Sequence, residues 1–286
     1  MTAQQWMKFS VKMGSAGLYK RCIIFMLRYL KLLPLIDYLR YQFHRILLAK
    51  KNIRFTKDHP KFKLPPNRIL YDISGSVNYL QYYEFGRSMA IYLSKKIEVL
   101  TKNLPAVRIL EWGCGPARII QWLPELFPRM SIKFAGADCN KDTIDWCSKN
   151  FAHIEFKTNS LYPPLGWKDG EFDIVYAVSV FTHLSEEKHY AWFSELVRLV
   201  KPGGFIIITV HGDRCCLGLR KNEMKKYHAG QLVVRGNVHE GKRLYTAYQS
   251  PEFMRKNLLK GMNFIDCFQD PLIQQDIWVV KTPFHT

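Results

Sequence analysis

The stretch from Val107 to Arg118 constrains the fold of this chain more than any other part of the sequence. An apolar run ends on the carboxylate of Glu111, and two glycines, Gly113 and Gly115, follow with one residue between them. Glycines at this spacing let a buried strand turn sharply and let the backbone approach a ligand closely. The stretch therefore predicts a strand and a turn at the edge of a ligand-binding crevice.

Apolar runs and amphipathic segments alternate along the rest of the chain. Further strands are expected at 132–137, 154–157, 172–178, 205–210, 264–268 and 277–280, and helices at 141–150, 186–200 and 251–260. Strands separated by helices predict an α/β fold, because parallel strands need long connections. The expected architecture is a Rossmann-like, doubly wound, mostly parallel seven-stranded sheet with a C-terminal antiparallel hairpin and an N-terminal helical extension. Ligands of such sheets bind at the carboxyl ends of the strands.

The first 68 residues differ in charge from the remainder of the chain. They carry 15 of the 42 Lys and Arg residues and two acids, a net charge of +13, whereas residues 69–286 carry +5. Two short amphipathic helices are expected there, at 18–33 and 35–47. Two roles of these helices stay open. Residues 18–50 lie on an anionic membrane surface, or the helices pack on the rest of the protein. No nucleic acid is expected as a partner, because no known nucleic-acid-binding motif is present.

The charge pattern and the prolines divide the chain into regions. Residues 1–68 are expected to form a basic amphipathic helical extension that ends in a linker at 59–66. Residues 69–286 are expected to form the main domain, with a lid or cap at 69–104 and a core at 105–286. Within the lid, residues 69–73 predict a short strand or turn edge, and Tyr79 to Leu100 predict one or two helices. Arg87, on this helical segment, is expected to contact the substrate.

The seven cysteines are scattered and form no CxxC pair. Neither a metal site nor a disulfide framework is therefore expected, which favours reduced thiols in a cytoplasmic protein. The apolar stretch from Cys22 to Ile36 contains Arg28, Lys31 and Pro34, so it is too short and too charged to span a bilayer. The expected location is the cytoplasm, with peripheral contact to the inner membrane face if the basic helices bind lipid. The oligomeric state stays open.

The first turn favours a cationic ligand over a dinucleotide. The third glycine of a GxGxxG turn would fall at residue 118, where this chain has Arg118. The carboxylate of Glu111 would repel a pyrophosphate, whereas it suits the ammonium and sulfonium groups of S-adenosylmethionine (SAM). Asp138 ends the second strand, 23 residues after Gly115, where a carboxylate can accept both ribose hydroxyls. These motifs favour SAM, and a nicotinamide-dependent oxidoreductase stays as a weaker alternative.

Together, these residues make the region 105–286 resemble the class I SAM-dependent methyltransferases. The resemblance rests on ordered blocks at 109–118, 136–140, 172–184, 192–199 and 201–205. The blocks at 179–184, 209–212, 248–254 and 275–276 are similar to a bacterial subgroup associated with glycans and secondary metabolites, of the methyltransferase 11/25 type. One departure is Ala117, where many members carry a third glycine.

The resemblance implies a SAM site built from the first four strands. Gly113 and Gly115 would pass close to the methionine part of SAM, with Glu111 near its ammonium, and Asp138 would bind the ribose. The segment around Ser160 would flank the adenine. The implied cofactor-binding residues are Glu111, Gly113, Cys114, Gly115, Asp138, Cys139, Asn159, Ser160 and Ala177.

Methyl transfer to a hydroxyl group requires a base, and histidine has a suitable pKa. His183 follows the fourth strand and His211 ends the fifth, so both are candidate catalytic residues. Substrate contacts are expected from Arg87, Ser179, Asp213 and Arg214. The interval 213–247 is basic, which suits an acidic or phosphorylated acceptor, although such a run of charges is also typical of a solvated face. The predicted activity is methylation of a small-molecule or glycan acceptor, preferably on oxygen, and the alternative is a catalytically inactive SAM-binding or scaffold subunit.

Overall fold

The computed structural model describes residues 32–128, 130–269 and 273–284. The chain divides into two compact units, residues 1–47 and residues 48–286, and the larger unit contains the sheet. Of the two predicted N-terminal helices, residues 18–31 lie outside the described residues. The second belongs to a longer helix, α3, which spans Leu33–Asp58. The predicted boundary at residue 68, between a basic helical extension and the main domain, stays a prediction.

Seven strands form one sheet in the order β3, β2, β1, β4, β5, β9, β8. All pairs among β1 to β5 are parallel, and β9 pairs antiparallel with both β5 and β8. This confirms the predicted fold. The order of strands reverses between β1 and β4, which is where such sheets open a ligand crevice. The strands are β1 Val107–Trp112, β2 Ile132–Asp138, β3 Glu155–Thr158, β4 Phe172–Ala177, β5 Val200–Val210, β8 Asn263–Gln269 and β9 Asp276–Lys281.

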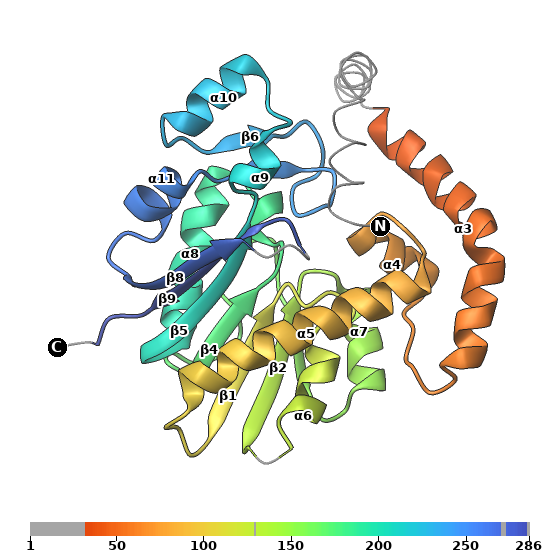
Figure 1. The fold of residues 1–286 in the computed structure, drawn as a ribbon, viewed down its shortest axis with the longest axis horizontal. Helices are drawn as coiled ribbons and strands as arrows, with labels where there is room; N and C mark the ends of the chain where they lie inside the picture. The colour runs from red at the N-terminus through yellow and green to blue at the C-terminus, as the bar shows by residue number, and fades with distance from the viewer. Residues whose placement is uncertain (1–31, 129, 270–272, 285–286) are drawn as a thin grey trace. The chain divides into compact units, whose positions relative to one another are not determined.

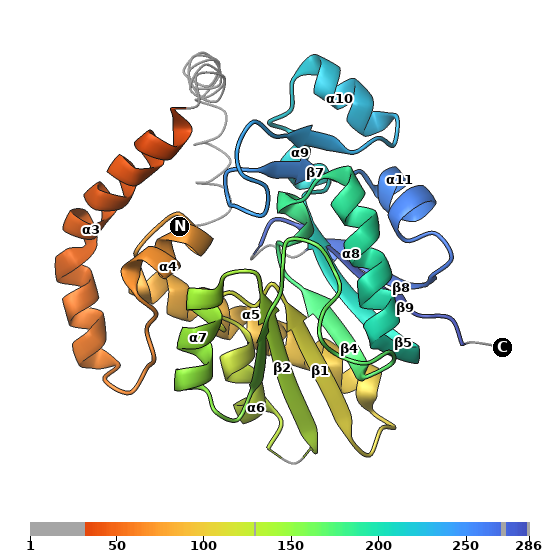
Figure 2. The same cartoon turned by 180° about the vertical axis from the view of Figure 1, so that it is seen from behind.

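Helices cover both faces of the sheet. In Figure 1 helix α5, Tyr79–Thr101, crosses the near face of the sheet, and Figure 2 shows helix α8, Glu186–Leu199, against the other face.

No helix of the described chain is both long enough and apolar enough to cross a membrane. The other elements are α4 Asn67–Ser74, η1 Ile120–Trp122, α6 Leu123–Leu126, α7 Lys141–Asn150, η2 Phe181–His183, α9 Asp213–Cys216, α10 Lys221–His228, β6 Val233–Arg235, β7 Thr246–Tyr248, α11 Pro251–Phe253 and the π-helix η3 Met254–Leu258.

The alternation of side chains along β1 produces two hydrophobic cores. Ile109 packs in the cluster that contains Met89 of α5, and Leu110 packs in the cluster that contains Leu196 of α8. All four side chains are fully buried. Burial of one such side chain contributes about 1.5–3 kcal/mol, so the two cores hold the sheet rigidly between its helices.

Helix α5 runs without interruption through Gly86 and packs directly on the turn that follows β1. A Cβ atom added at Gly86 would lie 2.1 Å from the backbone oxygen of Arg118. The glycine therefore permits close packing and does not break the helix. Asn78 caps the start of α5, because its side chain accepts a hydrogen bond from the backbone N–H of Gln81 at 3.1 Å.

The prediction of a strand or turn edge at 69–73 is wrong, because these residues lie in helix α4. Pro66 precedes the helix and Gly75 ends it in a left-handed conformation, with φ of +67°. Leu70 and Tyr71 are fully buried. Five residues were too few to separate a helical period from a strand, although the proline and the glycine are typical helix boundaries.

The second half of α3 packs against the start of α5. The side-chain amide of Asn52 donates to the backbone oxygen of Val77 at 2.7 Å and accepts from the backbone N–H of Tyr79 at 3.2 Å. The ring of Phe55 contacts those of Tyr79 and Tyr83 edge-on. Residues 59–66 contain no helix or strand, and their role as a linker stays a prediction. Residues 48–58 of α3 thus belong to the packing of the larger unit.

Candidate cofactor and acceptor site

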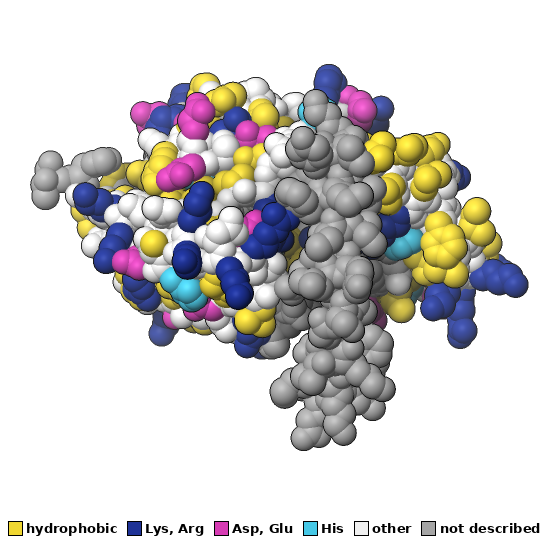
Figure 3. All heavy atoms as spheres, turned by 90° about the horizontal axis from the view of Figure 1, so that it is seen from above, with side chains coloured by type: hydrophobic (Ala, Val, Ile, Leu, Met, Phe, Trp, Pro, Cys, Tyr) yellow, Lys and Arg dark blue, Asp and Glu magenta, His cyan; other side chains and the backbone are white. Residues whose placement is uncertain are grey.

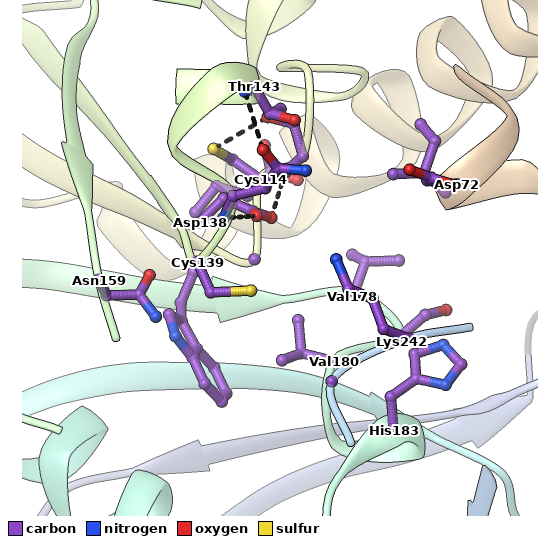
Figure 4. Close-up of a pocket in the computed structure, with 18 of the residues that line it drawn as sticks. Asp72, Cys114, Asp138, Cys139, Thr143, Asn159, Val178, Val180, His183 and Lys242 are labelled. Atoms are coloured by element: carbon purple, nitrogen blue, oxygen red, sulfur yellow. Dashed lines mark hydrogen bonds between the residues drawn. The ribbon is translucent and has the colours of Figure 1, made fainter. Parts of the chain in front are cut away.

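A cleft opens at the carboxyl ends of the central strands and encloses about 1190 Å³ of space, part of it open to solvent. Its walls come from α4, the turn after β1, the end of β2, the segments after β3 and β4, and the loop between β6 and β7 (Figure 4). Ten of the predicted site residues line it, namely Glu111, Gly113, Cys114, Gly115, Asp138, Cys139, Asn159, Ser160, Ser179 and His183. The sheet therefore gathers most of the predicted site into one cavity.

The turn after β1 requires glycine at its first position. Gly113 has φ of +73°, and a Cβ atom there would lie 2.2 Å from Cγ2 of Val180. The backbone N–H groups of Gly113 and Cys114 both donate to the backbone oxygen of Ala137, at 2.7 and 2.9 Å. Ala117 also has a positive φ, of +58°. The turn is thus fixed against β2 in a conformation that disfavours most side chains.

Asp138 shapes the cleft at the end of β2. One carboxylate oxygen accepts from the backbone N–H of Gly115 at 3.0 Å and the other accepts from that of Asn140 at 2.9 Å. Burial raises the pKa of Asp138, while these two hydrogen bonds and the charge of Lys242 act in the opposite direction. Each oxygen has a second lone pair, so the carboxylate can hold the turn and also accept a ligand hydroxyl.

Glu111 is a buried carboxyl group, 2% exposed, at the floor of the cleft. Its Oε2 atom accepts from the backbone N–H of Ile120 at 3.1 Å and from the hydroxyl of Tyr176 at 3.0 Å. Burial raises the pKa of Glu111 to about 8, against the effect of these hydrogen bonds and of Arg118. A group held in this way gains its charge readily when a cation lies beside it.

Arg118 also lines the cleft, with its guanidinium 4.0 Å from the centre of the Phe85 ring. Burial lowers its pKa, and the charge of Glu111 acts in the opposite direction. The sequence had indicated only that a glycine was missing at this position. In the structure Arg118 and Glu111 line the same cleft, so the two can bind the two charged ends of an amino acid.

His183 presents one ring nitrogen to the cleft. Its Nδ1 lies 2.7 Å from the backbone oxygen of Tyr245, and since a carbonyl oxygen only accepts, Nδ1 carries the proton in the neutral ring. Burial lowers the pKa of His183, and the nearby charge of Arg243 lowers it further. The ring is therefore neutral near pH 7, with Nε2 as a proton acceptor. Figure 4 shows the ring at the edge of the cavity.

The remaining predicted residues do not line the cleft. His211 directs Nδ1 to the backbone oxygen of Ala247 at 3.0 Å, and burial lowers its pKa to about 4. Ala177 is fully buried in the core of β4, and Val178 borders the cavity beside it. Exposed positions are occupied by Arg87 on α5 and by Asp213 and Arg214 on α9. The proposed roles of these residues stay predictions.

Several residues of the cleft had no sequence signal of their own. Asp72 lies on α4, which was predicted as a strand edge, and its carboxylate is 3.3 Å from Nε of Arg68. Lys242 and Arg243 belong to the basic interval after β5, but the motifs did not distinguish them from its other bases. Only the packing of distant segments brings these three side chains to the cavity.

Comparisons with known proteins point to a methyltransferase domain. Residues 109–204 match the family described as "Methyltransferase domain". The chain is 31% identical over 117 residues to a tRNA (carboxymethyluridine(34)-5-O)-methyltransferase of Arabidopsis thaliana, a match that covers 40% of this chain and 27% of that protein. It is 23% identical over 223 residues to a tRNA N(3)-methylcytidine methyltransferase of Schizosaccharomyces pombe, with 73% and 70% covered. The chain thus spans about a quarter of the first relative's length.

The fold is also found among solved structures. A protein of Pyrococcus horikoshii superposes with a TM-score of 0.51 at 16% identity, over 75% of this chain and 98% of that one. Residues 109–204 therefore resemble the domain of class I SAM-dependent methyltransferases, the architecture is the fold of such domains, and SAM is the cofactor expected of them. The family resemblance is thereby confirmed, while the bacterial glycan-associated subgroup stays a prediction.

Proposed function

We propose that this protein transfers the methyl group of SAM to a hydroxyl oxygen of a small-molecule or glycan acceptor, with His183 as the base. The observation that supports this most directly is the neutral His183 ring, whose Nε2 faces the same cleft as the glycine turn and Glu111. A hydroxyl group needs a proton acceptor during methylation, and a histidine held in one tautomer provides it.

The residues of the cleft fit SAM. Glu111 is a buried carboxyl that a cation would ionise, and Arg118 next to it suits a carboxylate. At Gly113 a Cβ would lie 2.2 Å from Cγ2 of Val180, so only glycine lets the turn pack this closely on the segment after β4. When bound, SAM supplies a methyl group already activated by its sulfonium.

The chain itself mainly positions the acceptor and removes a proton. The backbone of Gly113 and Gly115 and the carboxylate of Asp138 fix the donor end of the cleft. His183 would hold the acceptor hydroxyl through Nε2 and accept its proton as the oxygen takes the methyl group. The backbone oxygen of Tyr245 then stabilises the charged ring through Nδ1–H.

A transfer screen with tritiated SAM tests this proposal. Purified protein is incubated with cellular extracts separated into small-molecule, lipid-linked glycan, protein and RNA fractions, and calorimetry with S-adenosylhomocysteine (SAH) is run in parallel. We expect SAH binding and a labelled small molecule or glycan whose methyl is an ether. Binding of SAH without transfer to any fraction would instead favour a catalytically inactive SAM-binding subunit.

RNA is the main competing acceptor, because the two curated relatives described above are named tRNA methyltransferases. The match to the Arabidopsis relative covers only 27% of that protein, so its acceptor does not follow from the match. The expected absence of nucleic acid therefore stays a prediction. Labelled material that is degraded by ribonuclease would overturn the proposal of a small acceptor.

Binding of SAH at pH 7 is expected to release about one proton, because an ammonium beside Glu111 favours the ionised carboxyl. Burial holds the pKa of Glu111 at about 8 in the free protein, so this group is mostly protonated at pH 7. Calorimetric titrations in buffers of different ionisation enthalpy measure the released proton. Glu111→Gln should bind SAH without releasing it, whereas the exposed control Glu125→Gln should behave as wild type. Wild-type binding without proton release would show that Glu111 does not meet the ammonium.

We also propose that the basic extension binds an anionic membrane surface through α3. Hydrophobic side chains gather along this helix beside Lys and Arg (Figure 3). Leu35, Leu39, Phe43, Ile46 and Leu47 fall on one side of the helix, and all of them are exposed, Ile46 by 79%. The helix carries six bases and two acids. An exposed apolar stripe beside a net positive charge is complementary to anionic lipid.

Vesicle flotation of the full chain tests this membrane contact. The protein is expected to float with phosphatidylserine-containing vesicles, less so in high salt, and not with pure phosphatidylcholine. Phe43→Glu with Ile46→Glu should reduce the floating fraction at least about tenfold. Leu217→Glu, at a position 78% exposed outside α3, is the matched control. Equal flotation of the variant and wild type would refute the role of α3.

A further inference from the structure

The segment 178–183 joins the end of β4 to the proposed base and forms one wall of the cleft (Figure 4). Its residues that line the cavity are Val178, Ser179, Val180 and His183. The same segment contacts the donor side, since a Cβ atom at Gly113 would lie 2.2 Å from Cγ2 of Val180. The path of the segment therefore sets the position of His183 relative to the turn after β1.

Ser179 has an unusual backbone conformation near the start of this segment. Its φ is +61°, in the left-handed region that residues other than glycine seldom adopt. Such a conformation persists only where the surrounding structure imposes it, and it is found mainly at functional sites. The contacts of Ser179 therefore indicate what holds the segment in place.

Three hydrogen bonds hold Ser179 in this conformation. Its backbone N–H donates to Oγ1 of Thr209 at 2.7 Å, and its hydroxyl donates to Oε1 of Gln275 at 3.0 Å. Its backbone oxygen accepts from the hydroxyl of Thr182 at 2.8 Å. Every polar group of Ser179 thus has a partner, so its neighbours impose the left-handed turn.

Thr209 and Gln275 act on Ser179 as one unit. The hydroxyl of Thr209 donates to Oε1 of Gln275 at 2.6 Å, so this oxygen accepts two hydrogen bonds and uses both of its lone pairs. Both residues are buried, Thr209 completely. Thr209 lies on β5 and Gln275 directly precedes β9, and these two strands pair with each other. The unit therefore ties Ser179 to the central sheet.

A second buried glutamine, Gln249, holds the middle of the segment. Its Nε2 donates to the backbone oxygen of Phe181 at 3.0 Å and to Nε2 of His189 at 2.8 Å. Its Oε1 accepts from the backbone N–H of His211 at 3.1 Å. Gln249 is fully buried and directly follows β7. It therefore connects the helical turn η2, which ends at the proposed base, to β7 and to the end of β5.

We propose that Thr209, Gln275 and Gln249 are positioning residues for methyl transfer. They hold the segment at Ser179 and at Phe181, and so place Nε2 of His183 where it meets the acceptor hydroxyl. This inference rests on the proposed function and adds the residues on which its base depends. The effect on the rate is large because a small displacement of one reacting group disturbs the alignment that the reaction requires.

Replacing Thr209 by valine tests the proposal, because valine has nearly the same shape and lacks the hydroxyl that accepts from Ser179. We expect kcat to fall about 10- to 100-fold while the affinity for SAH stays close to that of wild type. Thr209→Ser keeps the hydroxyl and should recover most of the rate. The matched control is Thr282→Val, which removes a buried hydroxyl that donates to the backbone oxygen of Lys201 at 2.8 Å, after the opposite end of β9. It should keep the wild-type kcat.

Gln275→Met and Gln249→Met are second variants of the same test, since methionine is close to glutamine in size and lacks the amide. Each should lower kcat in the same way as Thr209→Val. Amide hydrogen exchange over residues 178–183 gives a readout that needs no acceptor. Exchange should be faster than wild type in Thr209→Val and unchanged in Thr209→Ser and Thr282→Val, because only the first loses the acceptor of the Ser179 N–H.

The outcomes separate this inference from the proposed function. Wild-type kcat in Thr209→Val and in both methionine variants would overturn the inference and leave the methyltransferase function intact. An equal loss of kcat in Thr282→Val, or exchange of residues 178–183 that Thr209→Val does not change, would overturn it as well. Absence of methyl transfer by the wild-type protein would overturn the proposed function itself and, with it, the role of these residues.

Discussion

Replacing His183 by asparagine is expected to lower kcat for methyl transfer about 100- to 10,000-fold, the usual contribution of a positioned base. Asparagine keeps a side-chain donor for the carbonyl of Tyr245, so the loop contact is retained while the proton acceptor is lost. The affinity for SAH should not change, since His183 lies at the acceptor side of the cleft. The measurement is a steady-state assay with the acceptor found in the tritium screen, together with calorimetry.

The pH profile distinguishes a base from a structural residue. The pKa of His183 is lowered from 6.5, so its neutral form should predominate at neutral pH and the wild-type rate should fall only on the acid side. His183→Asn should lose this acid limb. His228→Asn, on the exposed face of α10, is the matched control, and His211→Asn tests the second predicted histidine. An unchanged kcat, or an acid limb that persists in His183→Asn, would exclude His183 as the base.

The fold could be predicted because local signals and tertiary packing agree in the core. Helix α7 has the bounds predicted for it, since Asn140 accepts from the backbone N–H of Thr143 at 3.2 Å and so marks its start. The strands β1 and β4 are mainly apolar because helices cover both faces of the sheet. The prediction fails at 69–73, where a mainly apolar stretch of five residues fits either a helix or a strand.

The donor side of the site is local in sequence, whereas the acceptor side is not. Glu111, Gly113 and Gly115 lie within one turn, and Asp138 follows at the end of the neighbouring strand, so strand order alone brings them together. Lys242 reaches the cleft because its loop is held to the segment after β4, in part by the Glu240–Lys188 ion pair across a separation of 52 residues. No periodicity or motif encodes that pairing. His183 and His211 both follow strands, and only the packed structure distinguishes their surroundings.

Replacing Gly113 by alanine is expected to have the largest effect on the donor side. A non-glycine residue in the left-handed region costs about 1–2 kcal/mol, and overpacking against a neighbour costs about 1–3 kcal/mol. Both apply, because φ is +73° and the new Cβ would lie 2.2 Å from Cγ2 of Val180. The free energy of unfolding should fall by about 2–5 kcal/mol, and the affinity for SAH by at least about 100-fold, since the cofactor must approach this backbone.

Urea unfolding and SAH calorimetry measure the two effects of Gly113→Ala. Gly218→Ala is the matched control, because a Cβ atom there would meet nothing within 4 Å. Adding Val180→Ala removes the steric part but not the backbone strain, so Gly113→Ala with Val180→Ala should recover part of the lost stability. The affinity for SAH should stay low in the double variant, because the turn is still strained. Wild-type SAH affinity in Gly113→Ala would show that the cofactor does not depend on this close backbone approach, and the donor site would have to lie elsewhere in the cleft.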